Sequence, residues 1–169
     1  KKRLVFAAFL LAFQGFMGWF MVKSGLVDNP YVSHYRLAAH LSLALILLMF
    51  FLWTLFDFSE KSLPSKGFQS LKLPLHLFLK LIFITIIYGA FVAGLRAGKL
   101  YNTFPLMGND FIPVEWNTLA PLYKNFFQNP VTVQLIHRIL GTLTFVFGLF
   151  IALKLYVRLL KGNGEKSFF

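Results

Sequence analysis

The chain alternates between four long apolar stretches and shorter polar ones. The apolar stretches cover about residues 4–22, 35–56, 75–95 and 131–157, and a helix needs about 20 such residues to cross a bilayer. Pro74 is predicted to lie in the first turn of the third stretch, and no proline interrupts the interior of the others. Backbone groups in lipid must bond within their own segment, so spanning stretches of this kind form helices. The pattern predicts an all-α polytopic membrane protein, with residues 1–169 forming one four-transmembrane-helix bundle.

Composition supports a membrane protein. The 169 residues are 57% hydrophobic and 18% aromatic, with 22 Phe and a mean hydropathy of +0.67, which excludes an ordinary soluble domain. The net charge is +11, but the positive residues gather at span ends, which favours a topology signal over nucleic-acid binding. Cysteine is absent, which excludes thiolate ligands and covalent c-type haem attachment.

The positive charges predict an orientation. The side of the membrane with both termini and the connector between the second and third spans carries eleven Lys and Arg: Lys1, Lys2, Arg3, Lys61, Lys66, Lys72, Lys80, Lys154, Arg158, Lys161 and Lys166. The other side carries five: Lys23, Arg36, Arg96, Lys99 and Lys124. Cytoplasmic loops are the richer in Lys and Arg, so both termini are predicted to face the cytoplasm or the mitochondrial matrix.

Two histidines fall inside the apolar stretches at matched depth. His40 lies seven residues after Ser33, and His137 lies eight residues after Asn129; Ser33 and Asn129 are the predicted N-caps, with Pro130 in the first helical position. At 1.5 Å per residue both lie roughly 12 Å into their helices, in the outer half of the membrane. A weak repeat of Lys-Ser-Gly and Arg-Ala-Gly before these spans indicates two similar helix pairs, which would bring the histidines face to face.

An ionisable residue inside a membrane is a functional-site hypothesis by default. Two neutral imidazoles at one depth can ligate a metal, and between apolar helices the candidate is haem iron. The alternative is a hydrogen bond between helices. Small residues one turn deeper, Ala44 and Gly141, would leave room for a macrocycle, although small residues also simply allow close packing.

Three arginines near the outer ends of the spans are candidates to pair with haem propionates, and they are Arg36, Arg96 and Arg138. The alternative for each is that it only extends to the membrane surface. His34 and His76 are predicted to be interfacial. No apolar stretch contains Asp or Glu, so no catalytic carboxylate is predicted. The aromatic connector 99–128 is predicted to be either a lid over the site or an ordinary interfacial loop.

Several segments together carry a family resemblance. They read YRLAAHL at 35–41, GLRAG at 94–98, YNTFPLMG at 101–108, IP at 112–113 and QLIHR at 134–138. In this order they resemble the second half of the haem A synthase family, and the similarity covers nearly the whole chain. The resemblance implies half of an eight-helix pseudo-symmetric fold, with His40 and His137 as the axial pair of one haem b.

The resemblance also implies an activity and a setting. The family oxidises a methyl group of haem O to the formyl group of haem A for cytochrome oxidase assembly, in the bacterial cytoplasmic membrane or the mitochondrial inner membrane. The implied partners are haem O, membrane lipid, haem O synthase, further cytochrome oxidase assembly factors and an electron donor such as ferredoxin. A homo-oligomer is compatible with it, and nucleic acid is not expected.

The family's first half, with its essential glutamate, has no counterpart in these spans. The chain is therefore interpreted as a fragment, as a half-length form that pairs with another copy or a separate half, or as a degenerate relative, and its start at Lys1 favours a fragment. The oxidation itself would then need the missing half. Two rival functions stay open: a bis-histidine membrane cytochrome b that only transfers electrons, and a haem-free assembly or transport protein.

Overall fold

The computed structural model describes residues 1–23, 32–58 and 69–165. Four long helices dominate it: α1 (Lys2–Lys23), α2 (His34–Phe58), α3 (Gln69–Gly94) and α5 (Pro130–Glu165). Each is apolar and long enough to cross a membrane, by length and composition. The described residues contain no strand beyond one isolated bridge between Met107 and Asp110. The predicted all-α fold with four spans is therefore confirmed.

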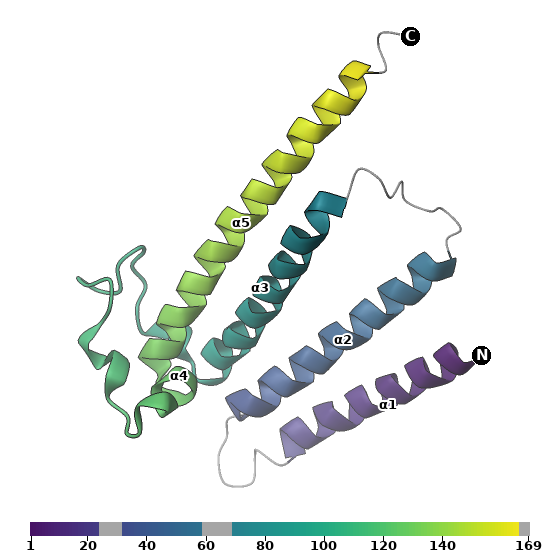
Figure 1. The fold of residues 1–169 in the computed structure, drawn as a ribbon. Coiled ribbons are helices and arrows are strands. Elements are labelled where there is room, and N and C mark those ends of the chain that lie inside the picture. The colour runs from purple at the N-terminus through teal and green to yellow at the C-terminus, as the bar shows by residue number, and fades with distance from the viewer. Residues whose placement is uncertain (24–31, 59–68, 166–169) are drawn as a thin grey trace.

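The four helices run up and down in chain order. α1 packs on α2, α2 on α3, and α3 on α5, and Figure 1 shows the four side by side in that order. α1 and α3 finish at the same end of the molecule at which α2 and α5 begin. We call this end the loop end, because the long segment between α3 and α5 lies there.

Helix starts follow from the residues at their caps. The carbonyl of Ser33 accepts a hydrogen bond from the Leu37 N–H at 3.0 Å, so α2 begins just after Ser33. Before α5, the side-chain oxygen of Asn129 accepts the Val131 N–H at 2.9 Å, and Pro130 takes the first helical position, where no N–H is needed. Both predicted N-cap positions agree with the structure.

Two helices extend beyond the predicted stretches. α3 begins at Gln69, six residues before the expected start, so Pro74 lies within the helix rather than in its first turn. A proline removes one backbone hydrogen bond to the turn before it and crowds that turn. Near a helix start few such bonds exist, so Gln69–Leu73 can still form a helical turn before Pro74. α5 continues to Glu165, past the apolar stretch that ends near residue 157. The loop around residues 25–31 and most of the connector after Phe58 lie outside the described residues.

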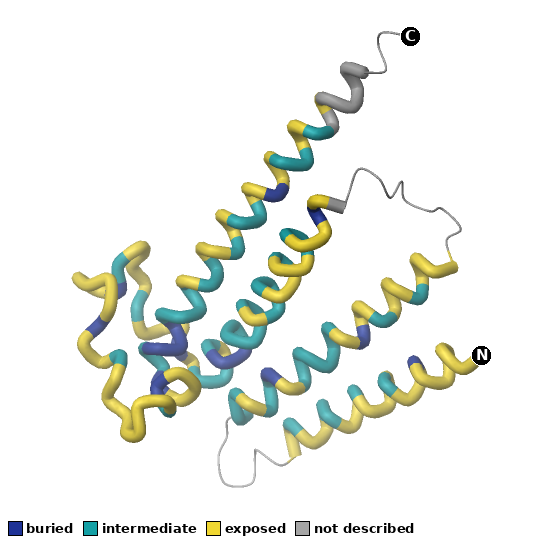
Figure 2. The backbone as a smooth tube through the Cα atoms, viewed as in Figure 1, coloured by how far each residue is buried: buried dark blue, intermediate teal, exposed yellow. Residues whose placement is uncertain are grey.

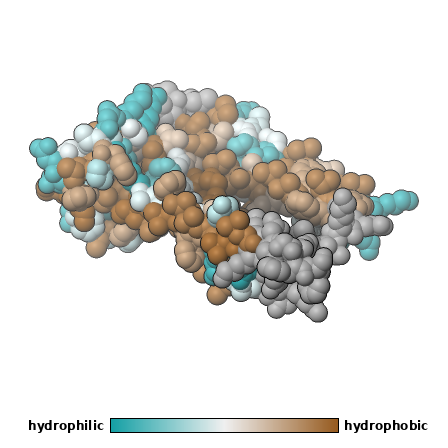
Figure 3. Space-filling view, turned by 90° about the horizontal axis from the view of Figure 1, so that it is seen from above, coloured by the Kyte–Doolittle hydropathy of each residue, from teal (hydrophilic) through white to brown (hydrophobic). Residues whose placement is uncertain are grey.

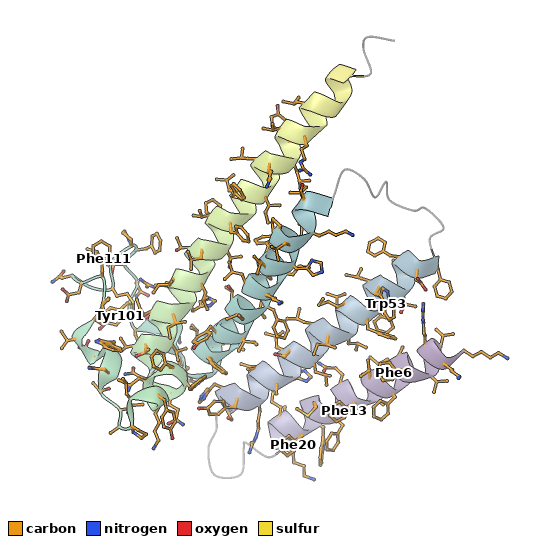
Figure 4. All side chains as sticks on the ribbon, in the orientation of Figure 1. Phe6, Phe13, Phe20, Trp53, Tyr101 and Phe111 are labelled. Carbon is orange, nitrogen blue, oxygen red and sulfur yellow. The ribbon has the colours of Figure 1, made fainter. Side chains whose placement is uncertain are left out.

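Apolar side chains face outward along all four helices, as a lipid-facing surface requires. Phe6, Phe13 and Phe20 project from α1 in Figure 4, and exposed positions line the helices in Figure 2. Figure 3 shows the same brown apolar surface from above. The buried core is small and lies toward the loop end, where α2, α3 and α5 meet through Ala38, Ala90, Phe91 and Val133.

Candidate functional site

The first membrane histidine, His40, lies on the face of α2 that packs against α1. The side-chain amide nitrogen of Gln14 lies 3.3 Å from its Nε2 and donates to its backbone carbonyl at 3.2 Å. Gly18, one turn further along α1, lets the ring approach: a Cβ there would be 3.1 Å from its Cε1. The half-buried His40 ring is thus held by one face of α1, on which Gln14 and Gly18 lie one turn apart.

The second histidine, His137, lies on the face of α5 that packs against α3. Its Nδ1 is 3.1 Å from the carbonyl oxygen of Thr85. A Cβ on Gly89 would be 3.2 Å from its Cε1, so this ring also lies on a glycine. The hydroxyls of Thr85 and Thr144 are 2.9 Å apart and join α3 to α5, about two turns after His137 along α5.

The two interfaces share one pattern. In each helix pair, the second helix presents a histidine whose Cε1 lies against a glycine of the first helix. In each, the residue four positions before that glycine, Gln14 or Thr85, bonds the histidine. This repeated histidine contact is therefore more specific than the sequence repeat of Lys-Ser-Gly and Arg-Ala-Gly at the span ends.

The structure places the two rings in different interfaces. His40 lies against α1, whereas His137 lies against α3, and α3 stands between α2 and α5 (Figure 1). The two histidine rings were expected to face each other across a pseudo-two-fold axis. Their contacts instead place them in two separate helix interfaces. Each histidine instead faces the helix that precedes its own in the packing order.

Each histidine has one ring nitrogen in contact with a polar atom of the neighbouring helix. At His137, the Thr85 carbonyl can only accept, so Nδ1 carries the proton and Nε2 keeps its lone pair. Metal-binding histidines typically have one ring nitrogen bonded in this way. At His40, Nδ1 and the neighbouring Gln14 Oε1 are buried without a hydrogen-bond partner, which marks an incomplete polar site. No group of three or more His, Asp or Glu that could hold a metal ion occurs among the described residues.

The small residues near the histidines differ in surroundings. A Cβ on Gly141 would meet nothing within 4 Å, so space is open one turn below His137. Gly94 is the opposite case, because a Cβ there would lie 2.5 Å from Cα of His34. This glycine allows the end of α3 to cross the start of α2.

The three predicted propionate partners have different contacts. Arg36 lies over the Phe20 ring of α1, 5.3 Å from its centre, and so faces the same helix as His40. Arg96 is exposed at the loop end with a left-handed backbone (φ 54°) just after α3. Arg138 donates to three carbonyls of the loop segment, those of Tyr101 (2.5 Å), Thr103 (2.5 Å) and Leu106 (3.2 Å). Its nitrogens therefore hold the YNTFPLMG segment on α5.

The two remaining histidines have local roles. His34 begins α2, stacks edge-on against Phe91 at 5.5 Å and lies on Gly94. His76 is exposed near the far end of α3, where its Nδ1 is 2.6 Å from the Lys72 carbonyl oxygen. His34 is the first residue of α2, whereas His76 lies seven residues after the start of α3. That both are interfacial stays a prediction.

The segment between α3 and α5 is folded onto the start of α5. It contains η1 (Ala97–Lys99), η2 (Val114–Asn117), η3 (Leu122–Lys124) and α4 (Asn125–Gln128). The buried amide of Asn129 donates to the Glu115 carbonyl at 2.7 Å and to the Asn125 side-chain oxygen at 3.0 Å. The buried Gln134 donates to the Tyr101 carbonyl at 2.9 Å.

Tyr101 also ties this segment together. Its hydroxyl donates to Glu115 at 3.1 Å, and its pKa is raised, first by desolvation and then by Glu115. Figure 4 shows Tyr101 and Phe111 within this segment beside α5. An apolar groove lies between the segment and α5, lined among others by Phe104, Met107, Phe111, Leu135, Ile139 and Leu143. The segment is thus bonded to the start of α5 at the loop end. That it forms a lid over the site stays a prediction.

Sequence reasoning missed the residues that hold the histidines. Gln14, which contacts His40, is the only amide within the first apolar stretch. That isolation was the signal to follow, since a polar side chain in a span usually has a partner. Thr85 acts through its backbone carbonyl, which no side-chain pattern could indicate.

The fold and these contacts define a class: an all-α polytopic membrane protein in which two helix pairs each hold a histidine inside the membrane. Comparison with known proteins then gives the family. The model of the cytochrome oxidase assembly protein family (COX15-CtaA) matches residues 1–167. The chain belongs to this family.

Its relatives include proteins named heme A synthase. That of Wolbachia pipientis wMel is 50% identical over 142 residues, which are 82% of this chain and 41% of that protein. That of Nitrosospira multiformis is 49% identical over 79% of this chain and 38% of its own length. Heme A synthase COX15 of Homo sapiens is 45% identical over 83% of this chain and 37% of its own length. The chain spans less than half the length of these relatives, and no solved structure matches it.

Proposed function

We propose that this chain is a haem-binding part of a haem A synthase, the oxidoreductase that converts a methyl group of haem O to a formyl group during cytochrome oxidase biogenesis. Haem O, membrane lipid, haem O synthase, cytochrome oxidase assembly factors and an electron donor such as ferredoxin are its proposed partners. Family membership supports the proposal. The observation that carries it is the pair of membrane histidines, each packed on a glycine and each bonded at one ring nitrogen by the neighbouring helix.

In this proposal His40 and His137 ligate haem b iron. When bound, such a haem takes up and passes on single electrons. The chain's own residues provide the setting: Gly18 and Gly89 admit the rings, and the Thr85 carbonyl orients His137. Arg36 and Arg96, at the loop end, are proposed to pair with propionates. Arg138 is proposed to contribute through the segment that it holds over α5.

Two arrangements of haem satisfy this ligand set. The resemblance implies one haem held between His40 and His137. The ring contacts favour a second arrangement, because α3 separates α2 from α5 and each ring faces a different interface. Each histidine would then hold its own haem, which would take up and pass on electrons separately from the other.

Absorbance spectroscopy of the detergent-purified protein tests the proposal. The reduced-minus-oxidised spectrum, with pyridine extraction, is expected to show a low-spin b-type haem. If one haem bridges the two histidines, His40→Ala and His137→Ala each abolish the signal. If there are two sites, each substitution removes about half of it and the double variant removes all.

His76→Ala provides the matched control. This histidine is exposed and bonded within its own helix, so its loss should leave the haem signal unchanged. Full haem retention by both His40→Ala and His137→Ala would refute the ligand assignment, and a colourless wild-type protein would favour the haem-free rival. A haem-loaded protein that supports no conversion of haem O in a membrane that also contains the missing half would favour the electron-transfer rival.

A further inference from the structure

An apolar groove lies between α2 and α3, on the side of the core away from the loop end. The two helices meet near the loop end through Ala38 and Ala90 and diverge toward their other ends, which we call the far end (Figure 1). The groove has a volume of about 480 Å³, within the range of about 300–1,000 Å³ that is typical of ligand sites. Neither His40 nor His137 lines it, so it is separate from the proposed haem ligands.

Apolar side chains of both helices form the walls of this groove. They include Leu45, Leu48 and Met49 of α2 and Leu79, Phe83 and Ile84 of α3. Several of these side chains are exposed, so the protein core does not fill the space between them. The hydrocarbon that surrounds such a surface in a bilayer is that of the lipid acyl chains.

One charged residue, Lys80, also lines the groove among the described residues. It lies eleven residues after the start of α3 at Gln69, about 16 Å along the helix, and therefore within the apolar stretch. An ammonium group at this depth is unfavourable unless it finds a partner or reaches the membrane surface. Within the described part of the chain no carboxylate supplies that partner, since the single ion pair there joins Arg3 to Asp57.

Lys80 is the innermost of three basic residues on one face of α3. Lys72, His76 and Lys80 follow at intervals of four residues, and four residues turn a helix by only about 40° beyond a full turn. All three are exposed. They form a basic stripe that begins near the far end and ends at the groove. A molecule with a negative head and an apolar tail matches these two adjoining surfaces.

We propose that the groove binds an anionic phospholipid, with its phosphate on the basic stripe and an acyl chain between α2 and α3. Clusters of Lys and Arg at a membrane surface attract anionic lipids, and the apolar walls favour an occupant with a hydrocarbon chain over a free phosphate. The bound lipid fills the space in which the two helix pairs diverge. It thereby joins α2 to α3 on the side that the core leaves open.

Native mass spectrometry of the whole chain, purified in detergent, measures the binding. The chain is mixed with dioleoyl phosphatidylglycerol, which is anionic, or with dioleoyl phosphatidylcholine, which has the same acyl chains and no net charge. We expect the anionic lipid to bind more tightly. Lys80→Gln should weaken its binding about fivefold, and the double variant with Lys72→Gln about 25-fold, because each basic residue near an anionic surface contributes about that factor. Binding of the phosphatidylcholine should not change.

Met49→Trp tests the groove itself, because the larger side chain occupies the space meant for the acyl chain. Bound lipid of both kinds should be lost. Ile46→Trp is the matched control, since Ile46 is an exposed residue of the same helix that does not line the groove. It should bind both lipids as the wild type does.

Lys2→Gln is the control for charge. It removes the same charge at the far end from α1, which does not line the groove, and should leave lipid binding unchanged. Equal weakening in Lys2→Gln and Lys80→Gln would overturn the proposal, because general attraction to a basic surface would then explain the binding. Full binding of the anionic lipid by Met49→Trp would also overturn it, and the groove would be left for a second copy or for another part of a longer chain. If Met49→Trp does not fold, the comparison of Lys80→Gln with Lys2→Gln decides alone.

Discussion

At the scale of single residues, the histidine rings depend on two glycines. A Cβ on Gly18 would come within 3.1 Å of the His40 ring, and one on Gly89 within 3.2 Å of the His137 ring. These contacts are tighter than ordinary van der Waals contact, so each ring would have to move. We expect Gly18→Ala and Gly89→Ala each to weaken haem binding about tenfold, because the ligand loses its fixed place. Titration of the purified protein with haemin measures this.

The control for this prediction is another glycine on α1. A methyl group added at Gly15 would have nothing within 4 Å, so Gly15→Ala should bind haem as the wild type does. An alanine in a helix interior usually stabilises by about 0.5–1 kcal/mol over glycine. Equal haem affinity in Gly18→Ala, Gly89→Ala and Gly15→Ala would show that ring contact with glycine has no role.

Gly94 makes a different kind of contact, because it lies against backbone. A Cβ there would be 2.5 Å from the His34 Cα, and neither main chain can move without shifting a helix end. Gly94→Ala is expected to lower the free energy of unfolding by about 1–3 kcal/mol, the usual penalty of overpacking. Gly98→Ala, whose Cβ would stand an ordinary 3.5 Å from Val92, should be neutral. Unfolding midpoints in mixed micelles compare the two, and equal midpoints would contradict the close crossing of α2 and α3.

At the scale of elements, the start of α5 depends on one buried asparagine. Asn129 caps the helix through its oxygen and donates through its nitrogen to the Glu115 carbonyl and to Asn125. Loss of an N-cap alone costs about 0.5–2 kcal/mol. We expect Asn129→Ala to reach the upper end of this range in thermal unfolding, and exposed Asn102→Ala to have no effect.

Asn129→Asp separates the two roles of that side chain. Aspartate keeps the capping oxygen and its charge suits a helix N-terminus, but it cannot donate to the Glu115 carbonyl. We expect it to remain destabilised. Wild-type stability in Asn129→Asp would mean that only the cap matters and that the segment between α3 and α5 is held by other contacts.

Arg138 is the second anchor of that segment. Its guanidinium reaches the carbonyls of Tyr101, Thr103 and Leu106, and hydrogen bonds from charged donors contribute about 1.5–3 kcal/mol. Arg138→Gln should speed amide hydrogen exchange across residues 101–108 by about tenfold or more. Arg138→Lys should do nearly the same, because one ammonium cannot match the fork of donors. Lys154→Gln on the same helix is the control, and unchanged exchange in Arg138→Gln would exclude the anchoring role.

These elements also show how far sequence reasoning reaches. Helix positions followed from apolar length and from caps such as Asn129, because those signals are local. The extension of α3 before Pro74 was missed, since a proline near a helix start is tolerated and the pattern does not say on which turn it falls. The side chains that hold the histidines were missed for a different reason. Gln14 and Thr85 are far from their partners in sequence, and one acts through its backbone, so only the packing of helices reveals them.

At the scale of the whole molecule, the row of helices explains why two interfaces look alike. α1 with α2, and α3 with α5, are antiparallel pairs that each place a histidine on a glycine about two turns from the loop end of the helices. The contact between α2 and α3 joins the pairs through the core at the loop end. The fold thus repeats one helix pair and does not close four helices around one centre. The outer faces of α1 and α5 are covered with apolar side chains.

The orientation of this row in the membrane is the last prediction. We propose that both termini face the cytoplasm or the matrix, because eleven Lys and Arg fall on that side and five on the other. The chain has no cysteine, so single substitutions report sidedness without background. Asn109→Cys in the loop-end segment should react with a membrane-impermeant maleimide added outside intact bacteria or mitoplasts, whereas Lys2→Cys should react only after the membrane is opened. Both positions lie beyond the apolar part of their spans, so labelling reports the side rather than burial. The reverse pattern would invert the proposed orientation and would place His40 and His137 in the inner half of the membrane.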